Sequence, residues 1–129
     1  MMRAQQMASR DEVSHIGPDG QGPNEMLREM GYELPDYYVG GRTNNIESIL
    51  GGEEKAERTW EMLLESPAHR AHLLGEGRVY AAQRRFGVAH LFDPNSAHRH
   101  YWVIVIVEPR DPNQKPMVCS PPPTICVTW

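Results

Sequence analysis

A continuous apolar segment, Tyr101–Val107, constrains the fold of this chain more than any other feature. Its sequence, Tyr-Trp-Val-Ile-Val-Ile-Val, is rich in aromatic and β-branched residues, which favour strands. Apolar and polar residues do not alternate along it, so we expect a central strand that is covered on both faces. A membrane-spanning helix needs about 20 apolar residues, and this segment is too short for one. We therefore expect His100–Glu108 to be the central strand of a sheet, which the chain enters through His100.

Length and composition are those of one globular domain. The chain has 129 residues, of which 40% are apolar and 23% charged. We assign residues 1–129 to a single domain, with residues 109–129 as a proline-rich C-terminal extension. The formal charge is −4, and no basic cluster is interleaved with aromatic residues, so nucleic acid is not an expected partner. The sequence contains no transmembrane segment, and Met1–Arg10 lacks the apolar core of a signal peptide. Either the mature protein is cytoplasmic or a leader lies upstream.

Hydrophobic periodicity predicts short helices before the central strand. The segment Glu53–Glu65 is the clearest of them, with Trp60 in its apolar stripe and expected in the core. Ser66 and Pro67 suit the N-cap and the first position of the next helix. The connection from Gly75 to Arg85 is polar and is expected to be a loop. The predicted helices cover Met1–Asp11, Gly22–Gly31, Glu53–Glu65 and Pro67–Leu74.

A second strand is predicted over Arg85–Phe92, and the turn Asp93–Ser96 joins it to the central strand in an antiparallel hairpin. One face of this second strand carries Phe86, Val88, His90 and Phe92.

The two cysteines, Cys119 and Cys126, lie in the C-terminal extension. Their spacing is too wide for a Cys-x-x-Cys motif, and two thiols alone do not make a structural zinc site. A local disulfide would indicate an oxidising compartment, whereas two free thiols beside a proline-stiffened loop are the alternative. The sequence leaves both open. Ile125–Thr128 is suited to an additional edge strand.

Three separated segments carry a family resemblance: Ser14–Gly20, Ser66–Leu74 and His100–Val103. Their content and order resemble the bacterial branch of the CAP superfamily, the cysteine-rich secretory, antigen 5 and pathogenesis-related proteins with SCP-like extracellular domains. Gly31-Tyr32 and Phe86-Gly-Val also fit this pattern. The resemblance covers Ala4–Val107. It implies an α+β fold, an α-β-α sandwich with a small antiparallel sheet between helical layers, and an extracellular or cell-envelope location.

The resemblance also implies a cleft with two histidines and two glutamates, which in some members binds zinc or another divalent cation. His15 and His100 match the two histidines. Asn44 stands where the family has its first glutamate, and Glu61 or Glu65 matches the second, with Glu65 preferred. An amide adds no negative charge beside a histidine, so we expect weaker metal binding than with the full set.

Other candidate residues have simpler interpretations. His69 and His72 are three residues apart on a predicted helix, a spacing that suits a metal pair. His69 lies in the first turn, where the helix dipole favours a neutral imidazole, so a structural role in the cleft is expected. Glu47 is expected to belong to a solvated acidic surface. His90 and His98 are expected to be hairpin or solvent-exposed residues.

The N-terminal segment is shorter than the first helix of the resembled family. Only fourteen residues precede His15, so we expect most of that helix to be missing. The surface left by this short segment is expected to be exposed or to be covered by a second copy of the chain.

The favoured function is a non-enzymatic binding module for a small apolar ligand, a cell-surface component or a partner protein, with a divalent metal such as zinc as an optional element. The alternative is a metal-assisted hydrolase or peptidase in which Glu65 acts as general base. A third interpretation is a degenerate family member that serves only in protein association.

Overall fold

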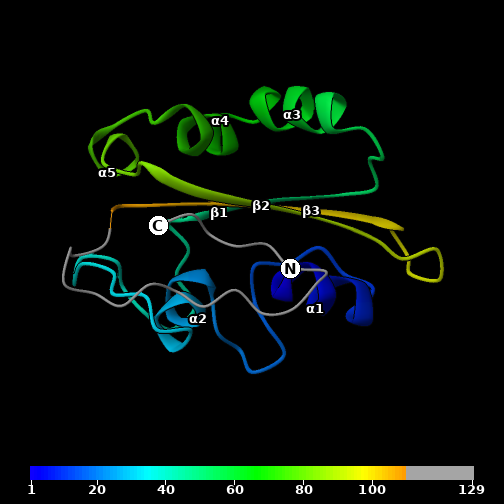
Figure 1. Cartoon of the computed structure of the whole chain (residues 1–129), viewed down its shortest axis with the longest axis horizontal. Coiled ribbons are helices and arrows are strands. Elements are labelled where there is room, and N and C mark those ends of the chain that lie inside the picture. Colours follow the sequence, from blue (N-terminus) through cyan, green and yellow to red (C-terminus); the bar gives the residue numbers. More distant parts are fainter. Residues whose placement is uncertain (110–129) are drawn as a thin grey trace.

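The computed structural model describes residues 1–109 and shows an α+β fold. A three-stranded antiparallel sheet lies between two helical layers, which confirms the expected α-β-α arrangement (Figure 1). The strand order is β1-β3-β2, where β1 is Glu47–Gly51, β2 is Arg85–Phe92 and β3 is His100–Val107. The apolar segment therefore forms the central strand, as predicted, and the β2–β3 hairpin is antiparallel.

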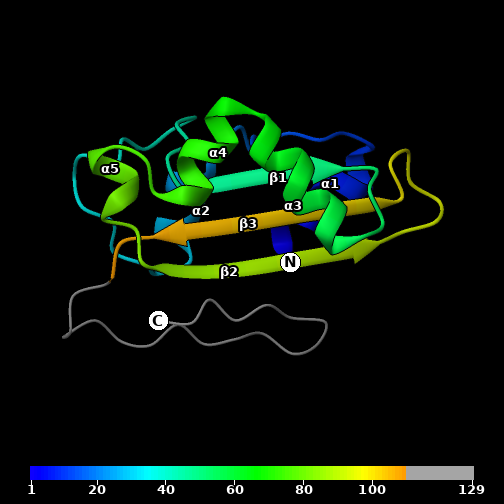
Figure 2. The same ribbon diagram turned by 90° about the horizontal axis from the view of Figure 1, so that it is seen from above.

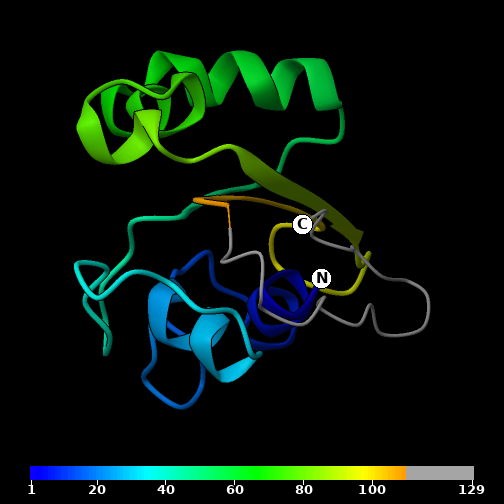
Figure 3. The ribbon, with the colours of Figure 1, turned by 60° about the vertical axis from the view of Figure 1, so that its left-hand side comes forward.

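One helical layer contains α1 (Met2–Arg10) and α2 (Pro23–Glu29). The other contains α3 (Ala56–Glu65), α4 (Pro67–Leu74) and α5 (Arg78–Ala81), and Figure 3 shows the two layers on opposite sides of the sheet. The helix α5 lies where the sequence predicts a loop. Strand β1 is also absent from the sequence analysis, because it begins with two polar residues, Glu47 and Ser48, and both are buried by tertiary packing.

The boundary between α3 and α4 follows from local chemistry. Ser66 has an extended backbone, and Pro67 opens α4 at the first helical position, where its missing N–H costs no intrahelical hydrogen bond. The helix ends at Gly75, whose φ of 68° lies in the left-handed region that glycine adopts without steric cost. The predicted helix Pro67–Leu74 is therefore confirmed at both ends.

The N-terminal helix covers part of the sheet. Its buried apolar residues pack in one cluster with Ile49 of β1 and with odd-numbered residues of the β2–β3 hairpin. The surface predicted to remain open beside a short N-terminal segment is thus occupied at this place by α1. The members of the cluster are Ala4, Met7, Ala8, Ile49, Ala89, Tyr101 and Val103.

The prediction that Trp60 is a core residue is wrong, because its side chain is 43% exposed. The residues that α3 buries are Thr59 and Leu63. Seen from above, the α3–α4 layer lies over β1 and β3 and leaves most of β2 uncovered (Figure 2). The flank of α3 that carries Trp60 consequently faces an open groove.

No helix within residues 1–109 is long and apolar enough to cross a membrane. The C-terminal extension from residue 110, with the Cys119–Cys126 pair and the predicted strand Ile125–Thr128, lies outside the described residues.

Candidate functional site

His15, in the segment after α1, contacts a buried carboxylate. Its Nδ1 lies 2.9 Å from Glu47 Oε1, and the other carboxylate oxygen of Glu47 accepts a hydrogen bond of 3.3 Å from Arg3 Nε. The side chain of Glu47 is only 3% exposed, whereas that of His15 is 34% exposed. A buried carboxylate therefore orients a partly accessible imidazole.

The assignment of Glu47 to a solvated acidic surface is wrong. Strand β1 places this residue inside the molecule, and α1 supplies Arg3 as its counter-charge. A carboxylate can be buried at tolerable cost only when it is paired in this way. Sequence reasoning missed Glu47 because its partner lies 44 residues away along the chain.

Asn44 contacts His15, and it also organises its own backbone turn. Its Nδ2 donates to the carbonyl oxygen of Glu47 at 2.9 Å and lies 3.3 Å from His15 Nδ1. Its Oδ1 accepts from the N–H groups of Ile46 and Glu47. These contacts use both ends of the amide, so Asn44 holds the chain at the entrance to β1, beside the imidazole.

Two histidines of α4 face β1 and the His15 region. Burial and the neighbouring His15 lower the pKa of His69, whose Nδ1 is buried without a hydrogen-bond partner among residues 1–109. His72 Nδ1 lies 2.7 Å from Ser48 Oγ, and burial lowers the pKa of His72 to about 4. Its imidazole is therefore neutral at pH 7.

His100 lies apart from His15. Its Nδ1 is 2.9 Å from His90 Nε2, and its ring stacks on Phe92. Glu47, the partner of His15, stands opposite Val105, whereas His100 begins β3. At about 3.4 Å per residue this separation along the strand is about 17 Å. The structure therefore does not bring the two predicted metal ligands into one cleft.

Glu65 pairs with a cation of its own helix. Its side chain is 69% exposed at the end of α3, where its nearest cation is Arg58, at 3.8 Å. A general base for the predicted hydrolase is not supplied from this position. Within residues 1–109, no three His, Cys, Asp or Glu side chains are grouped so that they could hold a metal ion. Zinc binding stays a prediction.

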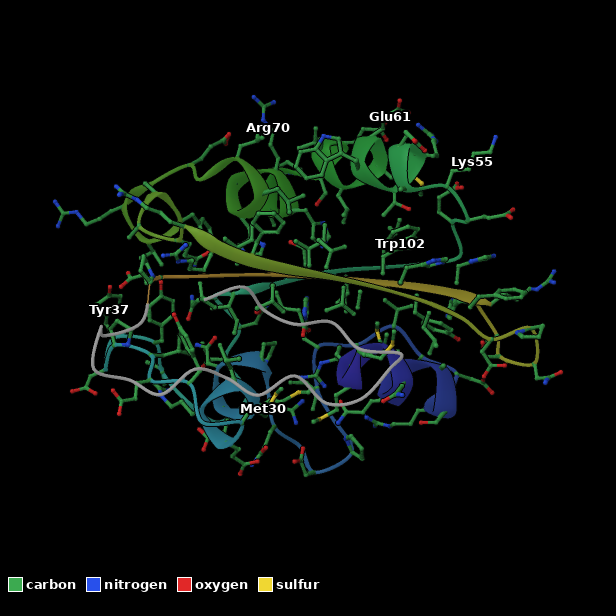
Figure 4. The ribbon with its side chains drawn as sticks, in the orientation of Figure 1. Met30, Tyr37, Lys55, Glu61, Arg70 and Trp102 are labelled. Atoms are coloured by element: carbon green, nitrogen blue, oxygen red, sulfur yellow. The ribbon has the colours of Figure 1, made fainter. Side chains whose placement is uncertain are left out.

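An apolar hollow lies elsewhere, between the α3–α4 layer and the sheet. This apolar groove has a volume of about 440 Å³. Figure 4 shows Trp102 on the α3 side of the sheet, and its indole N–H donates to the carbonyl oxygen of Glu53 at 2.6 Å. The main walls of the groove are Trp60, Leu73, Phe86, Val88, Trp102, Ile104 and Ile106.

Two buried polar atoms belong to residues that line this groove or the hollow next to it. Gln83 lines it and also lines a neighbouring hollow that includes His72, so the two spaces adjoin at this side chain. Gln83 Nε2 donates to the carbonyl oxygen of Asn45 at 2.7 Å and to Tyr38 Oη at 3.2 Å. Gln83 Oε1 and His72 Nε2 are buried and have no hydrogen-bond partner within residues 1–109. Gln83 carries no sequence signal, because it follows α5 in a segment that reads as a polar loop.

The structure thus shows an α+β protein with two separate candidate sites, the His15–Glu47 contact and the apolar groove. No family model matches the chain, and no curated protein and no solved structure matches it either. Membership of the CAP superfamily stays a prediction from the three sequence segments.

Proposed function

We propose that this protein is a binding module for a small apolar ligand that carries one hydrogen-bond donor. The observation that carries the proposal is Gln83 Oε1, which is buried without a hydrogen-bond partner within residues 1–109 and belongs to a residue that lines an apolar groove of about 440 Å³. Buried polar atoms in folded proteins nearly always have a partner, so an unpaired acceptor in a groove wall suits a ligand N–H or O–H. The volume lies within the range of small-molecule sites, about 300–1,000 Å³.

The walls indicate what the rest of the ligand is like. Trp60, Phe86 and Trp102 supply aromatic surface, which binds flat or hydrocarbon groups through apolar contact. Arg84 is the one ionised side chain that lines the groove. A neutral apolar molecule therefore fits, with a hydroxyl or amide N–H group beside Gln83 and a weakly polar group near Arg84.

Fragment binding observed by NMR tests the proposal. Phenols and aromatic amides are titrated into the full chain while the methyl signals of Ile104 and Ile106 are followed. Fragments with a donor should shift both signals and bind more tightly than their methylated analogues, which lack it. Trp60→Ala should weaken binding several-fold with little loss of stability, because Trp60 is half-exposed. Phe92→Ala removes an exposed aromatic side chain outside the groove wall and serves as the control. The proposal fails if no fragment perturbs these methyl groups.

A hydrolase is the second candidate, and the His15–Glu47 contact favours it. Nδ1 of His15 faces the carboxylate, so Nε2 is the ring atom left for proton transfer. In this version Glu47 is a positioning residue for His15. Hydrolysis of a simple aryl ester that is lost in His15→Gln and reduced in Glu47→Gln, with an altered pH profile in the latter, would support it. Equal rates in His15→Gln and the parent chain would exclude it.

The resemblance to the CAP superfamily supports a binding role in general. An extracellular location and an optional divalent metal follow from that resemblance alone, so both are part of the proposal. Calorimetric titration of metal-stripped protein with zinc, beside His15→Ala and His100→Ala, tests the metal.

A further inference from the structure

Strand β2 has an outer edge without a partner strand among residues 1–109, since β3 pairs with its other side. In antiparallel sheets the N–H and C=O groups of alternate residues point to opposite sides of the strand. The N–H of Asp93 donates to the carbonyl oxygen of Arg99 at 2.7 Å, in the same register as the strand pair. The odd-numbered residues of β2 therefore bond to β3. The even-numbered residues direct their backbone groups to the free edge: Phe86, Val88, His90 and Phe92.

The side chains of these residues are exposed as well. Phe86 is 62% exposed, Phe92 51% and Val88 40%, because the α3–α4 layer stops short of β2 (Figure 2). Natural edge strands are usually protected from pairing by lysine, proline or a bulge. The sequence Arg-Phe-Gly-Val-Ala-His-Leu-Phe contains no lysine or proline, and its register with β3 is unbroken. Within residues 1–109 the edge is therefore regular, largely apolar and unprotected.

Charge at the two ends of β2 is complementary when the strand meets a copy of itself. An antiparallel pair centred on Ala89 places Arg85 opposite Asp93 of the second copy, twice by symmetry. The same register places Phe86 opposite Phe92 of the second copy. The backbone groups that both residues direct to the free edge can then hydrogen-bond to each other. Their aromatic side chains form a cross-strand pair. A shift by two residues would instead place Arg85 opposite Leu91, and both charge pairs would be lost.

We propose that two copies of this chain associate through β2, antiparallel and centred on Ala89, to form one continuous six-stranded sheet from the two three-stranded sheets. The exposed row then lies in the middle of the joined sheet, between the α3–α4 layers of the two copies. This interface differs from the one predicted at the N-terminal segment. It does not depend on a ligand in the groove, although Phe86 and Val88 border both.

Sedimentation and amide hydrogen exchange on the full chain test the association. The sedimentation coefficient should rise from monomer to dimer with protein concentration. The amides of Val88 and His90 should become protected over the same concentration range, whereas those of Ala89 and Leu91 are protected throughout by β3. A monomer at all concentrations overturns the proposal. So does exchange at Val88 that responds to removal of residues 110–129 and not to concentration, which would assign the edge to the chain's own C-terminal segment.

A mutant cycle tests the register. Asp93→Asn keeps the side-chain acceptor that bonds to the N–H of Asn95, so the turn is preserved. In the parent chain this substitution removes an attraction and should weaken the dimer about 2- to 30-fold, as expected for two cross-strand charge pairs. In the Arg85→Glu background it removes a repulsion and should strengthen the dimer. An effect of the same sign in both backgrounds, or no effect in either, overturns the proposed register.

Discussion

Arg3 on α1 and Glu47 on β1 form an ion pair in which each side chain is only 3% exposed. The same carboxylate contacts His15, so one buried glutamate of β1 joins the N-terminal helix to His15. Arg3 Nη2 is buried without a hydrogen-bond partner in residues 1–109, and the pair therefore carries a desolvation cost that its Coulombic attraction must offset.

Glu47→Gln should destabilise the protein by about 3–5 kcal/mol, because it leaves the buried guanidinium of Arg3 without a counter-charge. Urea denaturation measures the loss. The control is the double variant Arg3→Met/Glu47→Leu, which removes both charges and should cost less than the single substitution. If the double variant is less stable than Glu47→Gln, the cost of the single substitution does not come from the uncompensated charge of Arg3.

Acidification should destabilise the fold through His72. Burial lowers the pKa of this imidazole from 6.5 to about 4, so the unfolded chain binds a proton more readily than the folded one. The stability due to the neutral form is complete above pH 6.5 and is lost as the pH falls toward 4, by about 3 kcal/mol in total. The free energy of unfolding, measured from pH 7.5 to 4, should fall more steeply in the parent chain than in His72→Gln. His98→Gln removes an imidazole from an exposed position and is the matched control.

Leu63→Ala should cost about 2–5 kcal/mol, because this side chain is 1% exposed and holds α3 on the sheet. Leu74→Ala is the matched control. Leu74 is 51% exposed at the end of α4, and its truncation should change stability by less than about 0.5 kcal/mol. Thermal unfolding followed by circular dichroism compares the two, and similar losses would mean that α3 is not anchored through Leu63.

Gly22→Ala should destabilise the protein by about 1–3 kcal/mol. A Cβ at this position would lie 2.6 Å from the backbone carbon and oxygen of Arg42, and the backbone cannot yield as a side chain can. At Gly40 the atoms nearest to a Cβ would belong to the carboxylate end of the flexible Glu25 side chain, so Gly40→Ala should cost less. Denaturant unfolding of both variants checks the order, and the reverse order would contradict a close approach of the two segments at Gly22.

Much of the fold is predictable because its elements depend on local signals. The uninterrupted apolar segment identifies β3 as a strand covered on both faces, and Ser66-Pro67 and Gly75 define the ends of α4. Strand β1 escapes prediction because Glu47 and Ser48 look solvated in sequence. Their burial depends on Arg3 and His72, which lie far away along the chain.

The candidate site was less predictable than the fold. The family resemblance groups Asn44 and His69 with His15 in one cleft. In the structure Asn44 contacts His15, and His15 contributes to the lowered pKa of His69. His100 is separated from His15, because the strand register places it at the far end of β3 from Glu47. Glu65 is exposed at the end of α3, where it pairs with Arg58. Gln83 and the groove have no local signal at all.

The local pattern of this chain specifies which segments become helices and strands, since capping residues, turn residues and apolar continuity act over a few positions. The assembly of functional groups was decided only when those elements packed. The α3–α4 layer leaves most of β2 uncovered, and Trp60 stays half-exposed. The β1–β3 register places Glu47, the partner of His15, far from His100 along the sheet. Contacts between distant segments determine which side chains are buried, which partners they have and why the edge of β2 is free. The energies of these contacts cannot be inferred from a short segment of the sequence.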